Sequence, residues 1–522
     1  MSATAPTSID PRVYANRWKT LMVLSLSLVI IGLDNTVLNV ALPTLQRHFS
    51  ASGSTLQWIV DAYTLAFAGL LLLAGTLGDH FGRKRLLQGG LAIFGAASIL
   101  AALAQNSAEL VGLRALMGIG GAMIMPATLS TVSNIFPREE RGKAIAVWSA
   151  TSAVGIGLGP FIGGLLLNYF SWSSVFWLNV PVAAAAMIAG VILVPETRDQ
   201  KPGRLDPLGS VLSVGALVAL VYPIIEAPDK GWTNLVILGS LGIAAVLGVA
   251  FAWWELRNPE PMLQLSFFRK PGFSIASFAI ALAFFGLMGA ILAFTQYLQF
   301  ARGFSALKAG AIMMPLVIGL VAGGGGSERF IKKFGTPRVM TGGLIGLAVV
   351  LSSALLWTPH TSVWVLCFTL ALLAFWMSNV MAPATGSVMS SIPESKAGVG
   401  SAMNDVNRQV GGALGVAIIG SIMNSAYRSR ISATVADLPG GVRHAARDSI
   451  GSAYAVAQHL PAAAARHLDT AAATAFTHAL GIGFFSAAIA ATAAAPLVIR
   501  LLPGAKTRHT DSHARAAAAA QA

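Results

Sequence analysis

The sequence predicts an all-α integral membrane protein with fourteen transmembrane helices, in which two six-helix bundles form a parallel repeat and two more helices are inserted between them. Three observations predict this fold: the composition, the recurrence of long apolar runs, and an internal repeat. Of the 522 residues, 55% are hydrophobic and only 11% are charged, whereas soluble globular chains carry about 25% charged residues. Because so few charges cannot cover the surface of a chain this long, lipid must be its solvent.

Apolar runs of about 20 residues or more recur along the chain, and each can cross a hydrocarbon core of ~30 Å as a helix. Strands that cross a membrane are shorter and alternate in polarity, so the runs are interpreted as helices. The first run is too long for the core of a signal peptide and is interpreted as a retained helix. The predicted spans are 20–43, 55–77, 86–105, 110–135, 144–168, 174–194, 206–226, 232–254, 273–297, 308–326, 338–357, 361–388, 398–424 and 479–502.

The basic residues predict the orientation of the chain. Fourteen spans place both termini on one side, and with the N-terminus inside, the inner loops and tails hold 24 of the 35 Lys and Arg residues. Cytoplasmic loops retain Lys and Arg, so both tails, 1–19 and 503–522, are predicted to be cytoplasmic. The same topology explains the net charge of +14. Basic residues divided among many short loops form no continuous surface for phosphates, so no nucleic-acid partner is expected.

An internal repeat divides the chain. Residues 81–91 (FGRKRLLQGGL) resemble residues 334–344 (FGTPRVMTGGL), 253 positions later, and 137–164 matches 393–420 at ordered Pro, Gly and Ala positions, 256 positions later. The predicted domains are therefore an N-terminal bundle over 20–195, two linker helices over 206–254, and a C-terminal bundle over 273–502 that includes a long outer loop, 425–478. In transporters built from such parallel halves, the substrate site lies between the halves.

Four motifs occur in the expected order along these spans. They are GTLGDHFGRK at 75–84, LDNTV at 33–37 running on to ALP at 41–43, Arg114 with Gly118, Gly120 and Gly121, and finally Gly155, Gly159, Pro160, Gly163 and Gly164. Together they resemble the major facilitator superfamily, and within it the fourteen-span drug:proton antiporters. The resemblance covers nearly the whole chain, except the tails and the 425–478 loop.

The resemblance implies roles for the motif residues. Gly75, Asp79, Gly82 and Arg83 would close the cytoplasmic side, and Arg114 would take part in proton transfer. The glycines of span five, with Pro160, would form the packing surface and hinge that mark antiporters. In the second half Lys332 stands in the place of Asp79, so this closing contact is expected in one half only. Without the resemblance, Asp79 and Arg83 would be interpreted as a membrane anchor, and Arg114 as an arginine that extends from a helix end to the interface.

Two carboxylates inside spans are the first choices for coupling. Asp34 lies about mid-membrane, where a carboxylate costs roughly 2.5–3.5 kcal/mol on insertion scales and therefore marks a cavity, a partner or a proton relay. The alternative is a structural role in which Asp34 bonds to Asn35 or Asn39.

Asp405 and Arg408 are three residues apart in span thirteen and share a helix face. Asp405 would alternate between a proton and a cationic substrate, and Arg408 would tune the pKa of its carboxyl. The alternative is a purely structural intrahelical ion pair.

Asp61 and Glu226, near the outer ends of their spans, are weaker candidates that could be interfacial and inert. The sequence has no GxxxxGK[ST] loop, which argues against ATP hydrolysis, and no nucleophile with a base. No enzyme activity and no cofactor are expected. No metal site is expected either, since the histidines of 425–478 lack ligand spacing. That loop is predicted to be an amphipathic outer cap with a helix over 462–468.

The sequence therefore predicts a proton-coupled antiporter that exports amphipathic or cationic drugs by alternating access. Its expected partners are small molecules, protons and the lipid of a bacterial plasma membrane, and a monomer is expected. The alternatives are a dedicated exporter of one metabolite, lipid or antibiotic, an importer by proton symport, and a membrane receptor or scaffold that binds a ligand without transporting it.

Overall fold

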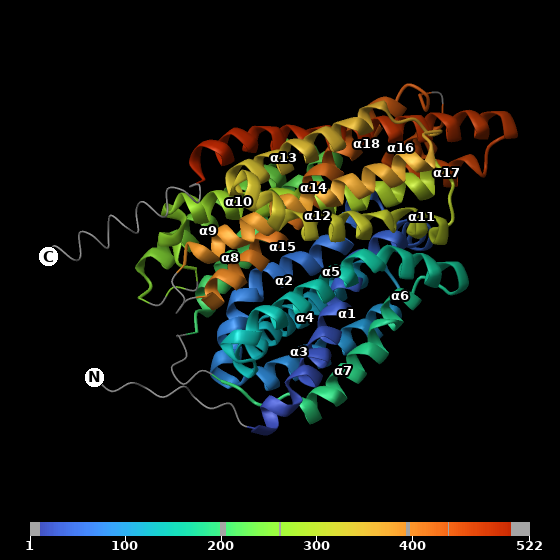
Figure 1. The fold of residues 1–522 in the computed structure, drawn as a ribbon. Helices are drawn as coiled ribbons and strands as arrows, with labels where there is room; N and C mark the ends of the chain where they lie inside the picture. Colours follow the sequence, from blue (N-terminus) through green and yellow to red (C-terminus); the bar gives the residue numbers. More distant parts are fainter. Residues whose placement is uncertain are drawn as a thin grey trace.

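The computed structural model describes residues 11–198, 205–259, 261, 263–392, 397–436 and 438–502. This part of the chain is helical throughout, as predicted (Figure 1). The first half contains α1 (Pro11–Phe49), α2 (Gly53–Phe81), α3 (Arg83–Ala102), α4 (Ser107–Ile135), α5 (Arg138–Tyr169), α6 (Ser174–Trp177) and α7 (Asn179–Leu193). Next come α8 (Pro207–Lys230) and α9 (Leu235–Arg257). The second half contains η1 (Leu265–Arg269), α10 (Pro271–Gln296), η2 (Tyr297–Ala301), α11 (Ala306–Met313), α12 (Pro315–Phe334), α13 (Thr336–Ser352), η3 (Ser353–Leu356), α14 (Val363–Ser390), α15 (Ala397–Ile431), α16 (Gly440–Asp448), α17 (Ile450–Ala457) and α18 (Ala462–Leu501).

Thirteen helical segments of the described ranges are long and apolar enough to cross a membrane. They correspond to thirteen of the fourteen predicted spans. The remaining span, 144–168, lies in α5, a helix of 32 residues whose described apolar part is Val154–Tyr169. The chain is thus a multi-pass membrane protein.

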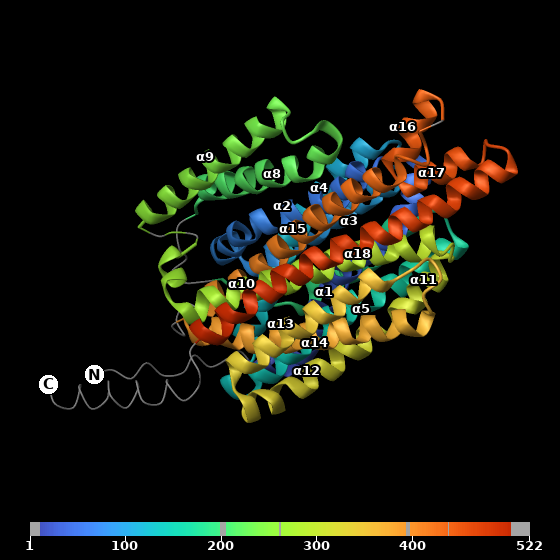
Figure 2. The ribbon, with the colours of Figure 1, turned by 90° about the horizontal axis from the view of Figure 1, so that it is seen from above.

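The helices form two groups, seen in Figure 1 as the blue-to-cyan helices below and the yellow-to-red helices above. Each group has its own apolar core, one built mainly from residues of α1–α7, with Leu292 of α10 and Val416 of α15, and the other mainly from residues of α10–α18. The α8–α9 pair lies at the periphery (Figure 2). Val221 and Ile225 of α8 pack with Leu65 of α2 and Ala413 and Ala417 of α15, so the inserted helix covers a seam between the groups.

The two groups share details that the sequence repeat predicts. Gly82 joins α2 to α3 with a φ of 105°, and Gly335 joins α12 to α13 with a φ of 81°. Both values lie in the left-handed region that favours glycine, which allows two helices to meet without a loop. A sharp corner of the same kind therefore occurs at the same place in both halves.

Several boundaries differ from the prediction. Helix α1 begins at Pro11 rather than 20, and α4 begins at Ser107 rather than 110, where Asn106 caps the helix by accepting a hydrogen bond from the Glu109 amide. The predicted short helix over 462–468 is part of the 40-residue α18. Its Ala-rich start has high helix propensity, so the helix continues where the hydropathy signal has already ended. Residues 1–10 and 503–522, most of the two predicted tails, lie outside the described residues.

The predicted outer loop, 425–478, is mostly helical. It contains the end of α15, the helices α16 and α17, and the start of α18. Arg428 of α15 holds this region by ion pairs to Asp229 and to Asp448, the latter at 2.7 Å. Helices α16 and α17 lie at the end of the bundle opposite to the one where α1 begins and α18 ends (Figure 1). We call the former the α17 end.

Candidate functional site

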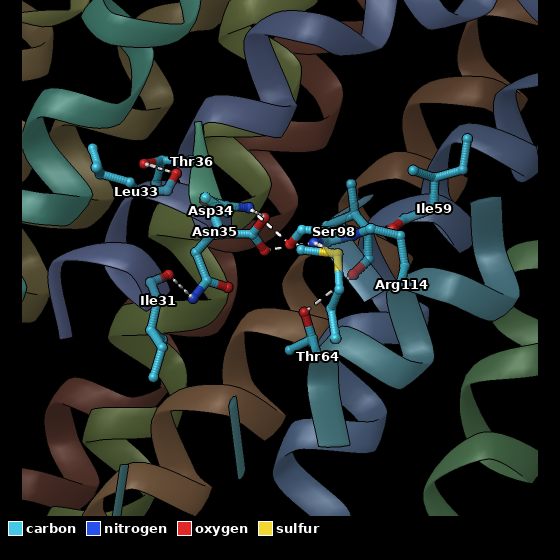
Figure 3. A network of polar contacts seen from close by, with 12 residues as sticks. Ile31, Leu33, Asp34, Asn35, Thr36, Ile59, Thr64, Ser98 and Arg114 are labelled. Atoms are coloured by element: carbon cyan, nitrogen blue, oxygen red, sulfur yellow. Dashed lines mark hydrogen bonds and ion pairs between the residues drawn. The ribbon is translucent and has the colours of Figure 1, made fainter. Parts of the chain in front are cut away.

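Asp34 and Arg114 form an ion pair inside the first half. Arg114 Nη1 of α4 donates to Asp34 Oδ2 of α1 at 2.5 Å, and their side chains are only 1% and 3% exposed. The pair bridges helices that are 80 residues apart in sequence, and Figure 3 shows the two side chains facing each other. A charged pair removed from solvent in this way is stable only if its remaining polar atoms also find partners.

Neighbouring groups supply these partners. Arg114 Nε donates to the Ile59 carbonyl at 3.1 Å, and the guanidinium carbon lies 4.4 Å from the centre of the Tyr63 ring. Asn179 Nδ2 donates to the second oxygen of Asp34 at 3.1 Å. The pair is therefore held by α1, α2, α4 and α7 together, and any change in its charge acts on four helices at once.

Two expectations about this pair require correction. The alternative interpretation of Arg114, as an arginine that extends from a helix end to the interface, does not hold, because its side chain is buried two turns inside α4, which begins at Ser107. Asn35 and Asn39 were the alternative partners of Asp34, yet their amide nitrogens donate to backbone carbonyls of α1 itself. The sequence analysis missed Asn179, although a polar side chain within the predicted span 174–194 was a signal.

A cavity lies between the two halves, and its space together with the open solvent at its mouth amounts to about 670 Å³. Its wall includes Ile31, Asn35 and Asn39 of α1, Thr64 of α2, Met125 of α4, Ile156 of α5, Phe284 and Met288 of α10, and Asp405, Arg408 and Gln409 of α15. We call it the central cavity. Asp34 does not line the cavity, although the next residue on α1, Asn35, does. The buried side chain of Asp34 is paired with Arg114 instead.

Asp405 and Arg408 contribute the charged groups of the central cavity. Arg408 Nη1 lies 3.5 Å from Asp405 Oδ1, so the two share a helix face as the spacing predicts. The distance is long for a charge-assisted hydrogen bond, and the guanidinium also stacks 4.8 Å from the centre of the Phe284 ring. The aromatic ring thus gives the arginine a second partner besides Asp405.

Asp61 and Glu226 have contrasting environments. Asp61 of α2 is completely buried, and neither of its oxygens has a hydrogen-bond partner among the described residues. The alternative interpretation of Asp61 as an exposed residue at the interface therefore does not hold. Glu226 of α8 accepts a hydrogen bond from Trp58 Nε1 at 3.0 Å and pairs with Lys230 at 3.0 Å. The Trp58 contact fastens α8 to the first half, whereas the Lys230 pair lies within α8.

The motif at 75–84 forms a compact polar junction between α2 and α3. Arg83 pairs with Asp79 at 2.7 Å and reaches toward the Ser130 carbonyl of α4. A side chain on Gly82 would collide with Glu196, whose carboxylate accepts a hydrogen bond from the Lys84 amide. A Cβ atom on Gly75 would lie 3.8 Å from Pro126 of α4, an ordinary van der Waals distance. The junction thus links α2, α3, α4 and the segment after α7.

The glycines of α5 bring its backbone against both halves. Gly155 and Gly163 face the carbonyls of Val29 and Val37 in α1, with 3.0 Å between each carbonyl oxygen and a hypothetical Cβ. Gly164 faces the carbonyl of Ala306 in α11 of the other half even more closely. The second half has the equivalent contacts, because Gly411 and Gly415 of α15 pack against backbone carbonyls of α10.

Pro160 has a direct role in the contact between α5 and α1. A proline has no amide N–H to donate to the carbonyl four residues earlier, which here belongs to Ile156. Thr36 Oγ1 of α1 donates to that carbonyl instead, at 2.9 Å. Thr36 reaches it because Gly159 has no side chain, since a Cβ on Gly159 would occupy the position of the Thr36 hydroxyl.

We therefore expect Gly159→Ala to destabilise the protein. Overpacking of a close contact costs about 1–3 kcal/mol, and the thermal unfolding temperature of the purified protein in detergent should fall. Adding Thr36→Ala removes the colliding hydroxyl and should recover most of the loss. The matched control is Gly112→Ala in α4, where a Cβ meets nothing within 4 Å. Equal effects of Gly159→Ala and Gly112→Ala would contradict this account of the contact.

Comparison with known proteins places this architecture in a family. The sequence profile of the Major Facilitator Superfamily matches residues 24–416. The chain belongs to this superfamily. The resemblance inferred from the four motifs is therefore confirmed.

Drug-export proteins of the superfamily are similar to the chain over most of its length. The multidrug efflux pump LfrA of Mycolicibacterium smegmatis is 36% identical over 492 residues, which cover 93% of this chain and 96% of LfrA. The tetracenomycin C resistance and export protein of Streptomyces glaucescens is 33% identical, covering 78% and 76% of the two chains. The methyl viologen resistance protein SmvA of Salmonella typhimurium is 32% identical, covering 90% and 95%.

Solved structures of the superfamily have the same fold. A bacterial homologue of the human lysosomal transporter Spinster, in an inward-facing and unoccupied conformation, aligns with a TM-score of 0.65 at 19% identity. The alignment covers 95% of this chain and 98% of that one. This likeness shows that the chain and that protein have the same overall arrangement of helices.

Proposed function

We propose that this major facilitator protein is a proton-coupled antiporter that exports amphipathic or cationic compounds from the cytoplasm by alternating access. The observation that carries the proposal is the central cavity, which places Asp405 and Arg408 between the two halves with the buried Asp34–Arg114 pair directly behind its wall. The names of its relatives, a multidrug efflux pump among them, support drugs as the cargo.

In this mechanism Asp405 binds either a cationic group of the cargo or a proton. Because each occupant removes the charge that attracts the other, binding of one disfavours binding of the other, and the linkage is reciprocal. A proton that enters from outside therefore displaces the cargo outward. Arg408, held by the Phe284 ring, keeps the emptied site from retaining a second cation.

The Asp34–Arg114 pair would convert protonation into movement. A proton on Asp34 cancels the charge that holds Arg114, so the contacts among α1, α2, α4 and α7 differ between the two protonation states. A conformational equilibrium shifts only when such differential contacts exist. Asp61, buried without a partner among the described residues, is proposed as an additional proton-binding group, and Glu226 remains a weaker prediction.

The remaining parts of the proposal concern the two ends of the bundle. With both termini in the cytoplasm, the Asp79–Arg83 junction lies on the cytoplasmic side and would hold that side closed in one state. The glycine contacts of α5, which touch both halves, would serve as the hinge. We propose a monomer that uses protons as the only coupling ion and needs no cofactor.

A dedicated exporter of one compound is the second candidate. It is favoured by the names of two relatives, which refer to resistance to a single compound, tetracenomycin C or methyl viologen. A panel of unrelated drugs distinguishes the candidates, because a dedicated exporter would protect cells against one compound only.

Transport in everted membrane vesicles tests the proposal. We expect methyl viologen to accumulate in vesicles with an acidic lumen, and to stop accumulating when nigericin collapses the pH gradient. Vesicles without the protein provide the background, and vesicles carrying Asp34→Asn should match it. Accumulation that continues at the same rate after the gradient is collapsed would refute proton coupling.

A further inference from the structure

A second cavity lies between the two halves at the α17 end. Its space together with the open solvent at its mouth amounts to about 500 Å³, and it is lined by apolar side chains and by Gln46, Gln57, Gln296, Asn424, Tyr427 and Ser449. We call it the outer cavity. The proposed coupling mechanism makes no use of it.

Both cavities are lined by α1, α2, α10 and α15, and on the last three of these helices their lining residues come close together. On α2 the nearest lining residues of the two cavities are Gln57 and Val60, on α10 they are Leu292 and Met288, and on α15 they are Gly420 and Val416. Separations of three or four residues correspond to roughly 5–6 Å along a helix. The two cavities are thus arranged in series and separated by about one layer of side chains.

The two cavities differ in chemistry. The central cavity contains the charged groups of Asp405 and Arg408, whereas the lining of the outer cavity contains no charged side chain. Its polar groups are amides and hydroxyls, which recognise uncharged hydrogen-bonding groups. The outer cavity therefore suits a different part of a molecule, or a different molecule.

Two amides of the outer cavity are placed reciprocally across the seam. Gln57 of α2 lies on Gly420 of α15, at 2.5 Å from a hypothetical Cβ, and Asn424 of α15 lies on Gly53 of α2, at 3.4 Å. Each glycine leaves room for the amide of the opposite half. The site is consequently built by both halves, and its geometry depends on their relative position.

Both amides have an unused hydrogen-bonding atom. Gln57, only 5% exposed, has no partner for its Oε1 atom, and Asn424 has none for Nδ2, among the described residues. Buried polar atoms are nearly always hydrogen-bonded, so an acceptor and a donor left open on a cavity wall indicate a ligand or water in the cavity. By contrast, Gln46 donates to Ser449 Oγ at 2.5 Å and Tyr427 donates to the Ala446 carbonyl, so these two groups are already engaged.

We propose that the outer cavity is a second cargo site, which binds uncharged molecules that carry both hydroxyl and carbonyl or amide groups on their way from the central cavity to the α17 end. A hydroxyl of the cargo donates to Gln57 Oε1, and a carbonyl accepts from Asn424 Nδ2. Ser449 and Ile450 line the cavity on the α17 side. The inference rests on the proposed export function but not on its coupling to protons.

Binding of two probes of opposite chemistry to the purified protein tests this inference. Tetracenomycin C is uncharged and rich in hydroxyl and carbonyl groups, whereas methyl viologen is a dication without any hydrogen-bonding group. We expect Gln57→Met and Asn424→Leu, which keep side-chain size, to raise the Kd of tetracenomycin C about 10-fold by calorimetry, as loss of one hydrogen bond to a buried group implies. The Kd of methyl viologen should stay within about 2-fold, the ordinary range for a change outside its site.

Asp405→Asn serves as the matched control and should have the opposite pattern, with weaker methyl viologen binding and unchanged tetracenomycin C binding. Equal weakening of both probes by Gln57→Met, or no weakening of either, would overturn the second site, as would a wild-type protein that does not bind tetracenomycin C. Calorimetry needs no gradient, so these outcomes do not depend on the vesicle experiment. Accumulation that continues in vesicles after the gradient is collapsed would refute proton coupling and leave the second site untouched.

Discussion

Replacing Asp34 with asparagine is expected to abolish gradient-driven export and to destabilise the protein. The substitution leaves the buried Arg114 guanidinium without a negative partner, among the Ile59 carbonyl, the Tyr63 ring, the Met117 sulfur and a neutral amide. Breaking a buried ion pair from one side costs about 3–5 kcal/mol. The initial rate of methyl viologen uptake into acidic everted vesicles should fall about 100-fold, at the upper end of typical coupling between two ligands.

A double variant separates the structural role of the pair from its role in coupling. Asp34→Asn combined with Arg114→Gln removes both charges, so no uncompensated charge remains buried, and the thermal unfolding temperature should return close to that of the wild-type protein. Export should remain absent, because the group that we propose to bind the proton is gone. If the double variant exports methyl viologen at the wild-type rate, the pair is only a structural element.

Asp405→Asn is expected to have the second largest effect, on binding rather than stability. Without the carboxylate, Arg408 is the only charged side chain in the described wall of the central cavity and repels cations. Two unit charges at about 4 Å interact by roughly 4 kcal/mol at an effective dielectric constant of 20. Since the site is partly hydrated and Arg408 already lies close to Asp405, we expect the Kd of methyl viologen to rise about 10- to 100-fold, or about 1.4–2.7 kcal/mol.

The pH dependence of binding provides the check for Asp405. In the wild-type protein, lowering the pH should weaken methyl viologen binding, because protonation removes the negative charge that the cation requires. In Asp405→Asn this dependence should disappear, while Asp405→Glu should retain it. Methyl viologen binding that is as tight in Asp405→Asn as in the wild-type protein, at every pH, would exclude Asp405 as the cation site.

The sequence by itself determined the class of the fold, because length and polarity decide whether a helix can cross lipid. Runs such as 20–43 and 273–297 needed no tertiary information to be identified as spans. The sequence also predicted that Asp405 and Arg408 share a face, since residues three apart on one helix always do. The repeat also matched Gly82 to Gly335, the two positions at which the structure has its sharp corners.

Only the tertiary structure decided which groups of different helices meet. Hydropathy indicates where a helix lies but not its rotation about its own axis, so nothing local revealed that Arg114 faces Asp34, or that Asn179 completes the pair. The same holds for Thr36 at the Ile156 carbonyl and for Gln57 over Gly420. These contacts depend on how closely two backbones approach, and that distance is set by packing across the whole bundle rather than by any one segment.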